Sequence, residues 1–562
     1  MSFYINLKQS NCKNCYKCIR NCAVKSIDFS SGQAQIVEDE CVLCGNCFVV
    51  CPQNAKEIRN DLSSAKALIH GDAPVFVSIA PSFVANYPNV TITAMTKALK
   101  QLGFAGVEET AVGATVVKDA YDRMVQDEKQ SVIIATSCPS VNFLVEKHFP
   151  NLIPCLAPVK TPMAVHISML RKEHPDGKFV FVGPCIAKKA EAEQTAENAD
   201  CVLTFEELDA WMKEAGISFE NLPDTDVDAG KARFFPTAGG ILKSMLCDSP
   251  KYSYLYVDGI EACTKALQDI EKGDIQNCFV EMSSCVGSCV GGPGMSSESR
   301  RPIRNAITVQ SYAKQSKGKD FCVSNRLPED INTTFRSLTK EKTTAGTHAI
   351  EEVLHSMGKF RPEDELNCGS CGYNTCREKA QAVIDGKAQS FMCLPFLKEK
   401  AESFSDSIIR NTPNGILILN ENMEIQQINA SARKMLGIST PTEALNAPIV
   451  DYMEPYDFID VLSGGINIHN KKVYLEARRK YVEETVLYDR TFHILMCIMR
   501  DITAEEESKK QKEDLSRHTV EITDKVIEKQ MRIVQEIASL LGETTAETKI
   551  ALTKLKESLK DE

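Results

Sequence analysis

Two cysteines four residues apart, Cys285 and Cys289, lie in a segment that runs into glycines, residues 279–294. Thiolates are the soft ligands that iron–sulfur clusters need. Their spacing lets both sulfurs converge from one turn, and the glycines let the backbone wrap closely around a bulky group. Two cysteines cannot ligate a whole cubane. The best partners elsewhere are Cys138, in Thr-Ser-Cys-Pro, and Cys185, in Gly-Pro-Cys.

Both partner cysteines follow β-rich runs, residues 131–135 and 178–182. In α/β domains the functional site lies at the carboxyl ends of the strands. The sequence therefore predicts an iron–sulfur site where buried strands end.

Residues 1–60 carry two runs of the form Cys-x-x-Cys-x-x-Cys-x-x-x-Cys. This spacing is typical of two-cluster bacterial ferredoxins, in which the fourth cysteine of each run ligates the other cluster. A pair of zinc sites is the alternative, and the double spacing disfavours it. We expect two [4Fe-4S] clusters that transfer electrons, one held by Cys12, Cys15, Cys18 and Cys51, the other by Cys41, Cys44, Cys47 and Cys22.

A fourth set of cysteines lies at residues 345–400, with three on one loop and the last after a helix-like stretch at 377–385. They can close a tetrahedral sulfur site, and the segment resembles the small four-cysteine [4Fe-4S] domain of corrinoid iron–sulfur proteins. Zinc is the alternative ligand, but the surrounding clusters favour iron. The four residues are Cys368, Cys371, Cys376 and Cys393.

Three ordered motifs between residues 70 and 330 resemble the active-site domain of the [FeFe]-hydrogenases: Thr-Ser-Cys-Pro, Pro-Cys-x-x-Lys-x-x-Glu and Glu-Met-x-x-Cys-x-x-x-Cys-x-Gly-Gly. The resemblance implies an H-cluster, which is a [4Fe-4S] cubane joined to a two-iron subsite with CO, cyanide and a dithiolate amine. By position, Cys138, Cys185, Cys285 and Cys289 hold the cubane and Cys289 bridges to the subsite. The resemblance also places Lys188 beside a cyanide, Glu191 in its motif, and further residues at the subsite: Ala80, Pro81, Ser82, Pro162, Gly183, Pro184 and Ser283.

The chain departs from this family pattern along the proton route. Ser137 stands where the family has a free cysteine, and a hydroxyl is a far weaker acid than a thiol, whose pKa is about 8.5. The family's relay glutamates align loosely with Asp119 and Asp122. Gly183 and Ser283 replace methionines. Residues that hold the cofactor are thus kept, whereas residues that speed turnover are changed.

Composition sets the broad class of the protein. The chain has 562 residues and a net charge of −11, which argues for several domains and against nucleic-acid binding. It has no apolar run long enough for a membrane span. Its 23 cysteines lie mainly in Cys-x-x-Cys clusters, and neither a secretory nor a twin-arginine signal is recognisable, so we expect a cytoplasmic metalloprotein.

The elements that must position these residues suggest a multidomain protein of α/β and α+β class. Strand-like and helical runs alternate over residues 74–340, beginning with a strand at 75–79 and a helix at 94–102. Residues 401–505 resemble a PAS sensor domain: a hairpin at 414–429, a helix at 430–436 closed by glycine, and later strands at 473–477 and 491–499. His493 on the last strand is a candidate haem ligand, although such histidines are more often only packed.

Residues 506–562 are charged and helical. Ile533, Ile537, Leu540 and Leu541 share one face, Gly542 is expected to end that helix, and Thr544 to cap a second. An apolar seam on two helices predicts pairing, in a homodimer or with a partner.

A slow active site followed by a PAS domain resembles the sensory branch of the [FeFe]-hydrogenases. We expect slow, reversible conversion of H₂ to protons and electrons, with the redox signal passing through the clusters to the PAS domain. Implied partners are ferredoxin or a similar redox protein, the hydrogenase maturation enzymes and a downstream signalling protein. Two alternatives stay open: a catalytic ferredoxin-linked hydrogenase that its PAS domain merely regulates, and a non-catalytic iron–sulfur protein related to cytosolic cluster-assembly factors.

Overall fold

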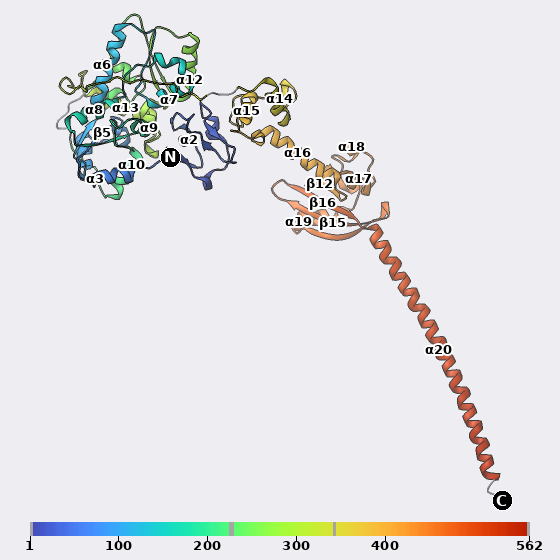
Figure 1. The fold of residues 1–562 in the computed structure, drawn as a ribbon. Helices are drawn as coiled ribbons and strands as arrows, with labels where there is room; N and C mark the ends of the chain where they lie inside the picture. The colour runs from blue at the N-terminus through green and yellow to red at the C-terminus, as the bar shows by residue number, and fades with distance from the viewer. Residues whose placement is uncertain (1–3, 224–229, 341–343, 559–562) are drawn as a thin grey trace. The chain divides into compact units, whose positions relative to one another are not determined.

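The computed structural model describes residues 4–223, 230–340 and 344–558. They form two compact units that divide between Leu397 and Lys398 (Figure 1). In the described part of the chain, no helix is both long and apolar enough to cross a membrane.

The N-terminal module contains short strands and two one-turn helices. β1 (Ile5–Leu7) pairs antiparallel with β4 (Lys56–Ile58), and β2 (Ile27–Asp28) pairs with β3 (Gln35–Ile36). Each helix carries the third cysteine of its run and begins after a residue in the left-handed backbone region. These helices are α1 (Lys17–Arg20), after Tyr16, and α2 (Asn46–Val49), after Gly45.

Two parallel sheets form the centre of the next domain, as the alternation of strand and helix signals predicts. Most of their strands are almost wholly buried, because helices cover them, whereas the edge strands at 106–109 and 253–258 are partly exposed. The first sheet has the order β6 (Gly106–Glu109), β5 (Val75–Ile79), β8 (Lys178–Gly183), β9 (Cys201–Thr204), and the second β10 (Ser253–Asp258), β11 (Cys278–Ser283), β7 (Val132–Ile134).

The helices that matter for the site follow directly from strand ends. α6 (Ala111–Asp127) follows β6, α7 (Pro139–His148) follows β7, and α9 (Ala187–Gln194) follows β8. α8 (Pro162–Glu173) packs beside α6. The predicted strand at 75–79 is confirmed as β5, and the helix predicted at 94–102 is α5 (Ile92–Gln101), which Thr91 caps by accepting a hydrogen bond from the amide of Ala94. The remaining α-helices of this domain are α3 (Leu62–Ile69), α4 (Phe83–Asn86), α10 (Phe205–Glu214), α11 (Gly240–Ser244), α12 (Ile260–Lys272) and α13 (Pro302–Lys314).

The four-cysteine segment packs on the N-terminal module. α14 (Thr347–Ser356) and α15 (Cys376–Ile384) frame it, and α15 confirms the helix predicted at 377–385. Arg20 donates to the Ser370 carbonyl at 2.8 Å and Lys25 to the Gly372 carbonyl at 2.7 Å. A Cβ on Gly372, whose φ is +98°, would lie 2.7 Å from Ile19. The cysteine loop is therefore pressed against α1.

The second unit contains a five-stranded antiparallel sheet of order β13-β12-β16-β15-β14. The predicted hairpin is confirmed as β12 (Gly415–Asn420) and β13 (Ile425–Ile428), and the predicted helix as α17 (Ala430–Leu436), which Gly437 ends with a φ of +72°. The last strand begins later than expected, because residues 491–493 form a turn. The other elements are α18 (Pro441–Ala444), α19 (Tyr456–Gly464), β14 (Ile468–Leu475), β15 (Lys480–Asp489) and β16 (Ile494–Asp501).

A continuous helix, α20 (Thr503–Ser558), follows the sheet (Figure 1). The prediction that Gly542 ends one helix and Thr544 caps another is wrong. Thr544 Oγ1 bonds back to the Leu540 carbonyl at 2.7 Å, as a threonine does inside a helix. One glycine costs a helix only about 1 kcal/mol relative to alanine, too little to break a long run of helix-forming residues.

Candidate metal centre and active site

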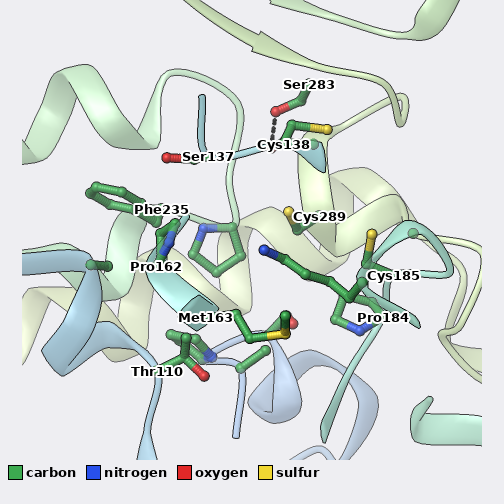
Figure 2. Close-up of a pocket in the computed structure, with 18 of the residues that line it drawn as sticks. Thr110, Ser137, Cys138, Pro162, Met163, Pro184, Cys185, Phe235, Ser283 and Cys289 are labelled. Atoms are coloured by element: carbon green, nitrogen blue, oxygen red, sulfur yellow. Dashed lines mark hydrogen bonds between the residues drawn. The ribbon is translucent and has the colours of Figure 1, made fainter. Parts of the chain in front are cut away.

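Four cysteines from three strand ends line one cavity of about 110 Å³. Because about 10–15 Å³ of such space holds one water molecule, the cavity is large for a natural interior. Cys138 follows β7, Cys185 follows β8, and the last two follow β11. Figure 2 shows Cys138, Cys185 and Cys289 around this space. The set is Cys138, Cys185, Cys285 and Cys289.

Ionising these four thiols without a bound cation is unfavourable. Burial raises the pKa of Cys289 to about 12, and the sulfurs of Cys138 and Cys185 add to the rise. Bound cations invert this effect, because a coordinated thiol is deprotonated outright. The donor set thus fits a cationic iron cluster and disfavours four free thiolates.

Glycines allow the loop after β11 to close on the loop after β8. A Cβ on Gly292 would lie 2.5 Å from the carbonyl oxygen of Pro184. A Cβ on Gly291 would lie 2.0 Å from the Val286 carbonyl. Neither position has room for a side chain, so these glycines set the approach of the two cysteine-bearing loops.

A buried triad of polar groups fixes Lys188 in the cavity wall. Its Nζ donates to Glu191 Oε2 at 2.7 Å and to Thr161 Oγ1 at 2.8 Å, and the Thr161 hydroxyl donates to Glu191. Thr161 also caps α8, where Pro162 is the first residue. Glu191 therefore positions the lysine without lining the cavity itself.

Among the other predicted contact residues, Ala80, Pro81, Ser82, Pro162, Pro184 and Ser283 line the cavity. The Ser82 hydroxyl is buried and has no hydrogen-bond partner, so it is free to meet a polar ligand. Gly183 is not part of the wall. Its missing side chain instead makes room for Phe181, whose ring would lie 2.7 Å from a Cβ there.

The residues expected on the proton route separate into two groups. Ser137 lines the cavity and lies 3.1 Å from the hydroxyl of Tyr121. Asp119 is 46% exposed and pairs with Lys118 at 2.7 Å. Asp122 is buried and accepts a hydrogen bond from the Leu246 amide at 3.0 Å. The structure does not bring either aspartate to Ser137.

Several of the ferredoxin cysteines lie near one another in the structure. Cys22 lies near the second run. Burial is the main cause that raises the pKa of Cys47, and the charges of Cys44, Cys41 and Cys22 raise it further. Cys18 has Cys12 and Cys15 as neighbours. Cys51 Sγ accepts the Ala55 amide at 3.3 Å.

One ferredoxin cysteine, Cys44, lies near the cavity cysteines. Burial raises the pKa of Cys285 most, and nearby thiolates raise it further. Among them is Cys44 of the ferredoxin module. Its neighbour Gly45, with φ +72°, packs so tightly that a Cβ would lie 2.6 Å from Pro293.

Cys368, Cys371, Cys376 and Cys393 line one small cavity of about 20 Å³. Within residues 4–223, 230–340 and 344–558, no three His, Cys, Asp or Glu side chains converge in the manner of a single-ion site.

Sequence reasoning missed several wall residues. Thr110, Met163, Phe235 and Met282 also line the cavity, and Figure 2 shows Thr110, Met163 and Phe235 there. Thr110, Met163 and Phe235 lie outside the cysteine motifs. Met282 lies next to Ser283, the position where the family has a methionine. The Phe-Phe-Pro stretch at 234–236 is the one local signal that could have indicated a wall segment.

Family comparison assigns the domains. The family described as iron only hydrogenase large subunit, C-terminal domain, matches residues 73–293, which contain the four cavity cysteines. The chain contains an iron-only hydrogenase domain. Three further families match: a 4Fe-4S binding domain at 34–57, a putative Fe-S cluster domain at 364–395 and the PAS fold at 404–505.

Curated relatives of the hydrogenase domain have different roles. Iron hydrogenase 1 of Clostridium pasteurianum is 22% identical over 314 residues, which cover 46% of this chain and 55% of that protein. The cytosolic Fe-S cluster assembly factor NAR1 of Yarrowia lipolytica is 27% identical over 228 residues, 34% of this chain and 46% of that protein. The chain thus spans about half the length of these two relatives.

Solved structures give lower overall similarity. [FeFe]-hydrogenase HydA1 from Chlamydomonas reinhardtii is 18% identical with a TM-score of 0.38, and the match covers 50% of this chain and 100% of that one. The PAS domain of nitrogen regulation protein NR(II) from Vibrio parahaemolyticus is 18% identical with a TM-score of 0.16, covering 17% and 97%. The domain assignments rest on the family matches.

Proposed function

We propose that this chain is a hydrogen sensor that slowly interconverts H₂ with two protons and two electrons and signals through its PAS domain. The observation that carries the proposal is the convergence of Cys138, Cys185, Cys285 and Cys289 on one cavity whose wall includes Lys188. When bound, an H-cluster supplies the metal centre for hydrogen chemistry. The four cysteines would hold it, with Cys289 shared between its two parts.

The surrounding residues fit such a cofactor. Lys188 is a buried cation held by Glu191 and Thr161, and it lines the cavity where an anionic cyanide would need a donor. Ser82 contributes a buried hydroxyl that has no protein partner. Since a buried polar group without a partner costs free energy, a ligand that satisfies it would be stabilised.

Slow turnover follows from the groups around Ser137. A serine and a tyrosine face each other where the family has a thiol, and burial raises the pKa of Tyr121 above its usual value. Both hydroxyls form hydrogen bonds but ionise poorly near neutral pH. This pair suits a sensor, which needs binding and a modest rate.

The cysteine neighbourhoods give an order for electron transfer. Cys285 of the hydrogenase cavity neighbours Cys44, whose set includes Cys22. Cys22 and Cys371 in turn share Lys25 as a charged neighbour. Electrons would therefore pass from the H-cluster through the ferredoxin module to the four-cysteine domain.

The signal would leave through the helix that follows the last ligand. α16 (Leu394–Asn411) begins directly after Cys393. Its final turn is held by Asn429, whose amide donates to the Ile409 carbonyl at 2.9 Å and whose Oδ1 accepts the amide of Ile416, in β12, at 2.9 Å. A shift of the ligand Cys393 would thus act on α16, whose last turn is hydrogen-bonded to Asn429 of the PAS domain.

A non-catalytic role in cluster assembly is the second candidate, and the similarity to the NAR1 factor favours it. A catalytic hydrogenase regulated by its PAS domain is the third. Implied partners of the proposed sensor are a ferredoxin-like redox protein, the maturation enzymes and a downstream signalling protein.

Infrared spectroscopy of the protein matured with its accessory enzymes distinguishes the candidates. The proposal predicts bands of iron-bound CO and cyanide together with slow H₂ oxidation. Cys289→Ala should lose the bands, whereas the matched control Cys322→Ala, at an exposed cysteine outside the cavity, should keep them. Absent bands would favour the assembly role, and bands with fast turnover would favour the catalytic enzyme.

A further inference from the structure

An unbroken chain of hydrogen bonds runs from the cavity wall to the protein surface through a buried histidine. Thr110, on the wall, has its Oγ1 2.7 Å from Ser78 Oγ. Ser78 Oγ lies 2.8 Å from His166 Nδ1, and His166 Nε2 lies 2.9 Å from Glu108 Oε2. Ser78 and His166 are fully buried, whereas the Glu108 side chain is 30% exposed.

Elements from separate parts of the fold bring these four groups together. Ser78 lies in β5, Glu108 in the neighbouring β6, and Thr110 at the junction of β6 and α6. His166 comes from α8, which can approach α6 because Gly113 has no side chain: a Cβ there would lie 2.6 Å from His166 Cβ.

The charges at the surface end set the direction of the chain. Burial alone would raise the pKa of Glu108, but hydrogen bonds from Arg326 and His166 hold it at about 2. The carboxylate therefore accepts the Nε2 proton of His166 and leaves Nδ1 as an acceptor. Ser78 then donates to Nδ1, and Thr110 donates to Ser78. Arg326 also bonds Glu173, which anchors the exit at the surface.

We propose that Thr110, Ser78, His166 and Glu108 conduct protons between the cavity and solvent, a role that rests on the hydrogen chemistry proposed above. A proton arriving at Thr110 Oγ1 displaces the hydroxyl proton to Ser78 Oγ, the Ser78 proton passes to His166 Nδ1, and the Nε2 proton passes to Glu108. Glu108 releases it to water. One proton enters and one leaves, with no electron transferred; the hydroxyls and the imidazole then return to their starting tautomers.

The expected route past Ser137 lacks this continuity. Tyr121 hydrogen bonds to Ser137 and to Thr136, and in the described residues no hydrogen bond leads from it to Asp119 or Asp122. Asp119 is instead held by Lys118. The His166 chain is thus the continuous path, and it reaches the cavity at Thr110, a point apart from Ser137 (Figure 2).

A Ser-His-Glu set also resembles a hydrolytic triad, but this role does not fit. Ser78 is 0% exposed and its hydroxyl is fully engaged by Thr110 and His166. A nucleophile must reach a substrate atom, and this one faces only its own network. A purely structural ion network is the remaining alternative, and the experiment must separate it from conduction.

The test compares matured full-length protein with Thr110→Val, which keeps the shape but removes the hydroxyl, Ser78→Ala and His166→Gln. The measurement is isotope exchange between H₂ and D₂O, with iron content and infrared bands as a check on cofactor loading. Each variant should exchange more slowly, on the order of a hundredfold, the lower end of what a positioned acid or base contributes. Thr110→Ser should rescue the rate lost in Thr110→Val, and the solvent isotope effect should rise in the slow variants.

Two further readouts decide the assignment. Nitrogen NMR of histidine-labelled full-length protein should find a proton on Nε2 of His166; a proton on Nδ1 would overturn the path. Equal exchange rates in Thr110→Val and Thr110→Ser at full cofactor loading would overturn it and leave the proposed function standing. Infrared bands lost from Thr110→Val alone would assign Thr110 to cofactor binding instead. A wild-type protein with neither bands nor exchange would remove the proposed function and this path together.

Discussion

The hydroxyl of Tyr121 lies 3.1 Å from the hydroxyl of Ser137 on the cavity wall. The same tyrosine accepts the backbone amide of Thr136 at 3.0 Å, so its ring is fixed behind the serine. Neither hydroxyl is a good acid, and the next carboxylates are engaged elsewhere. On the proposed function, this pair would slow the exchange of protons beside the cofactor site.

Replacing Ser137 by cysteine should raise the hydrogen turnover of the matured protein about tenfold, because a thiol near pKa 8.5 carries protons better than a hydroxyl. Turnover is measured with an artificial electron acceptor, and infrared bands verify equal cofactor loading. Ser137→Ala is the matched control, and its hydrogen turnover should not rise. An unchanged or lower rate in Ser137→Cys would place the slow step elsewhere.

Replacing Cys393 by alanine should remove one cubane, about four of the roughly eighteen irons expected for four cubanes and a two-iron subsite. The infrared bands of the active site should stay, because Cys393 lies in the separate small cavity. Cys322→Ala, at an exposed cysteine, should keep all iron. About fourteen irons and one zinc in the wild-type protein, with the zinc lost in Cys393→Ala, would instead assign zinc to the small cavity.

The exposed apolar face of α20 should pair with a second copy of the chain. Val520, Ile527, Val534 and Leu541 recur every seven residues and are more than half exposed, which is unfavourable for a lone helix. Burying each such side chain is worth about 1.5–3 kcal/mol, or roughly ten- to a hundredfold in Kd.

Analytical ultracentrifugation of full-length protein tests this pairing. Val534→Asp should raise the Kd of dimerisation at least about tenfold. Ser539→Asp, on the opposite side of the helix, should leave the Kd unchanged. A wild-type protein that stays monomeric at micromolar concentration would show that the face serves a different partner.

The grouping of the cysteines that line the two cavities could be predicted from sequence, because much of their spacing is local. Cys285 and Cys289 share one turn, and the strand runs before Cys138 and Cys185 indicated where each loop would start. Contacts between distant segments could not be predicted in this way. The docking of the Cys371 loop on α1, and the meeting of Ser78 with His166, depend on the packing of whole elements.

Two local signals misled the prediction. Gly542 is compatible with a helix when its neighbours are strong helix formers, and Thr544 bonds within the helix instead of capping it. His493, expected on the last strand and more often packed there than bound to haem, instead lies in a turn, is 68% exposed and pairs with Glu421 at 2.9 Å.

The central claim is that hydrogen changes the second unit through the Cys368–Cys393 cluster. Reduction of a cluster adds one negative charge, and two unit charges about 8 Å apart interact by roughly 2 kcal/mol at an effective dielectric of about 20. Allosteric coupling usually needs about 1–3 kcal/mol. A charge of this size beside Cys393 would be large enough to bias α16, which begins at the next residue.

Hydrogen–deuterium exchange of the PAS domain and α20 in matured protein, with and without H₂, tests this claim most directly. The account predicts changed protection at the end of α16, around Asn429 and along α20, and no change in Cys393→Ala, which keeps its active-site bands. Identical protection with and without H₂ in the wild-type protein would contradict it.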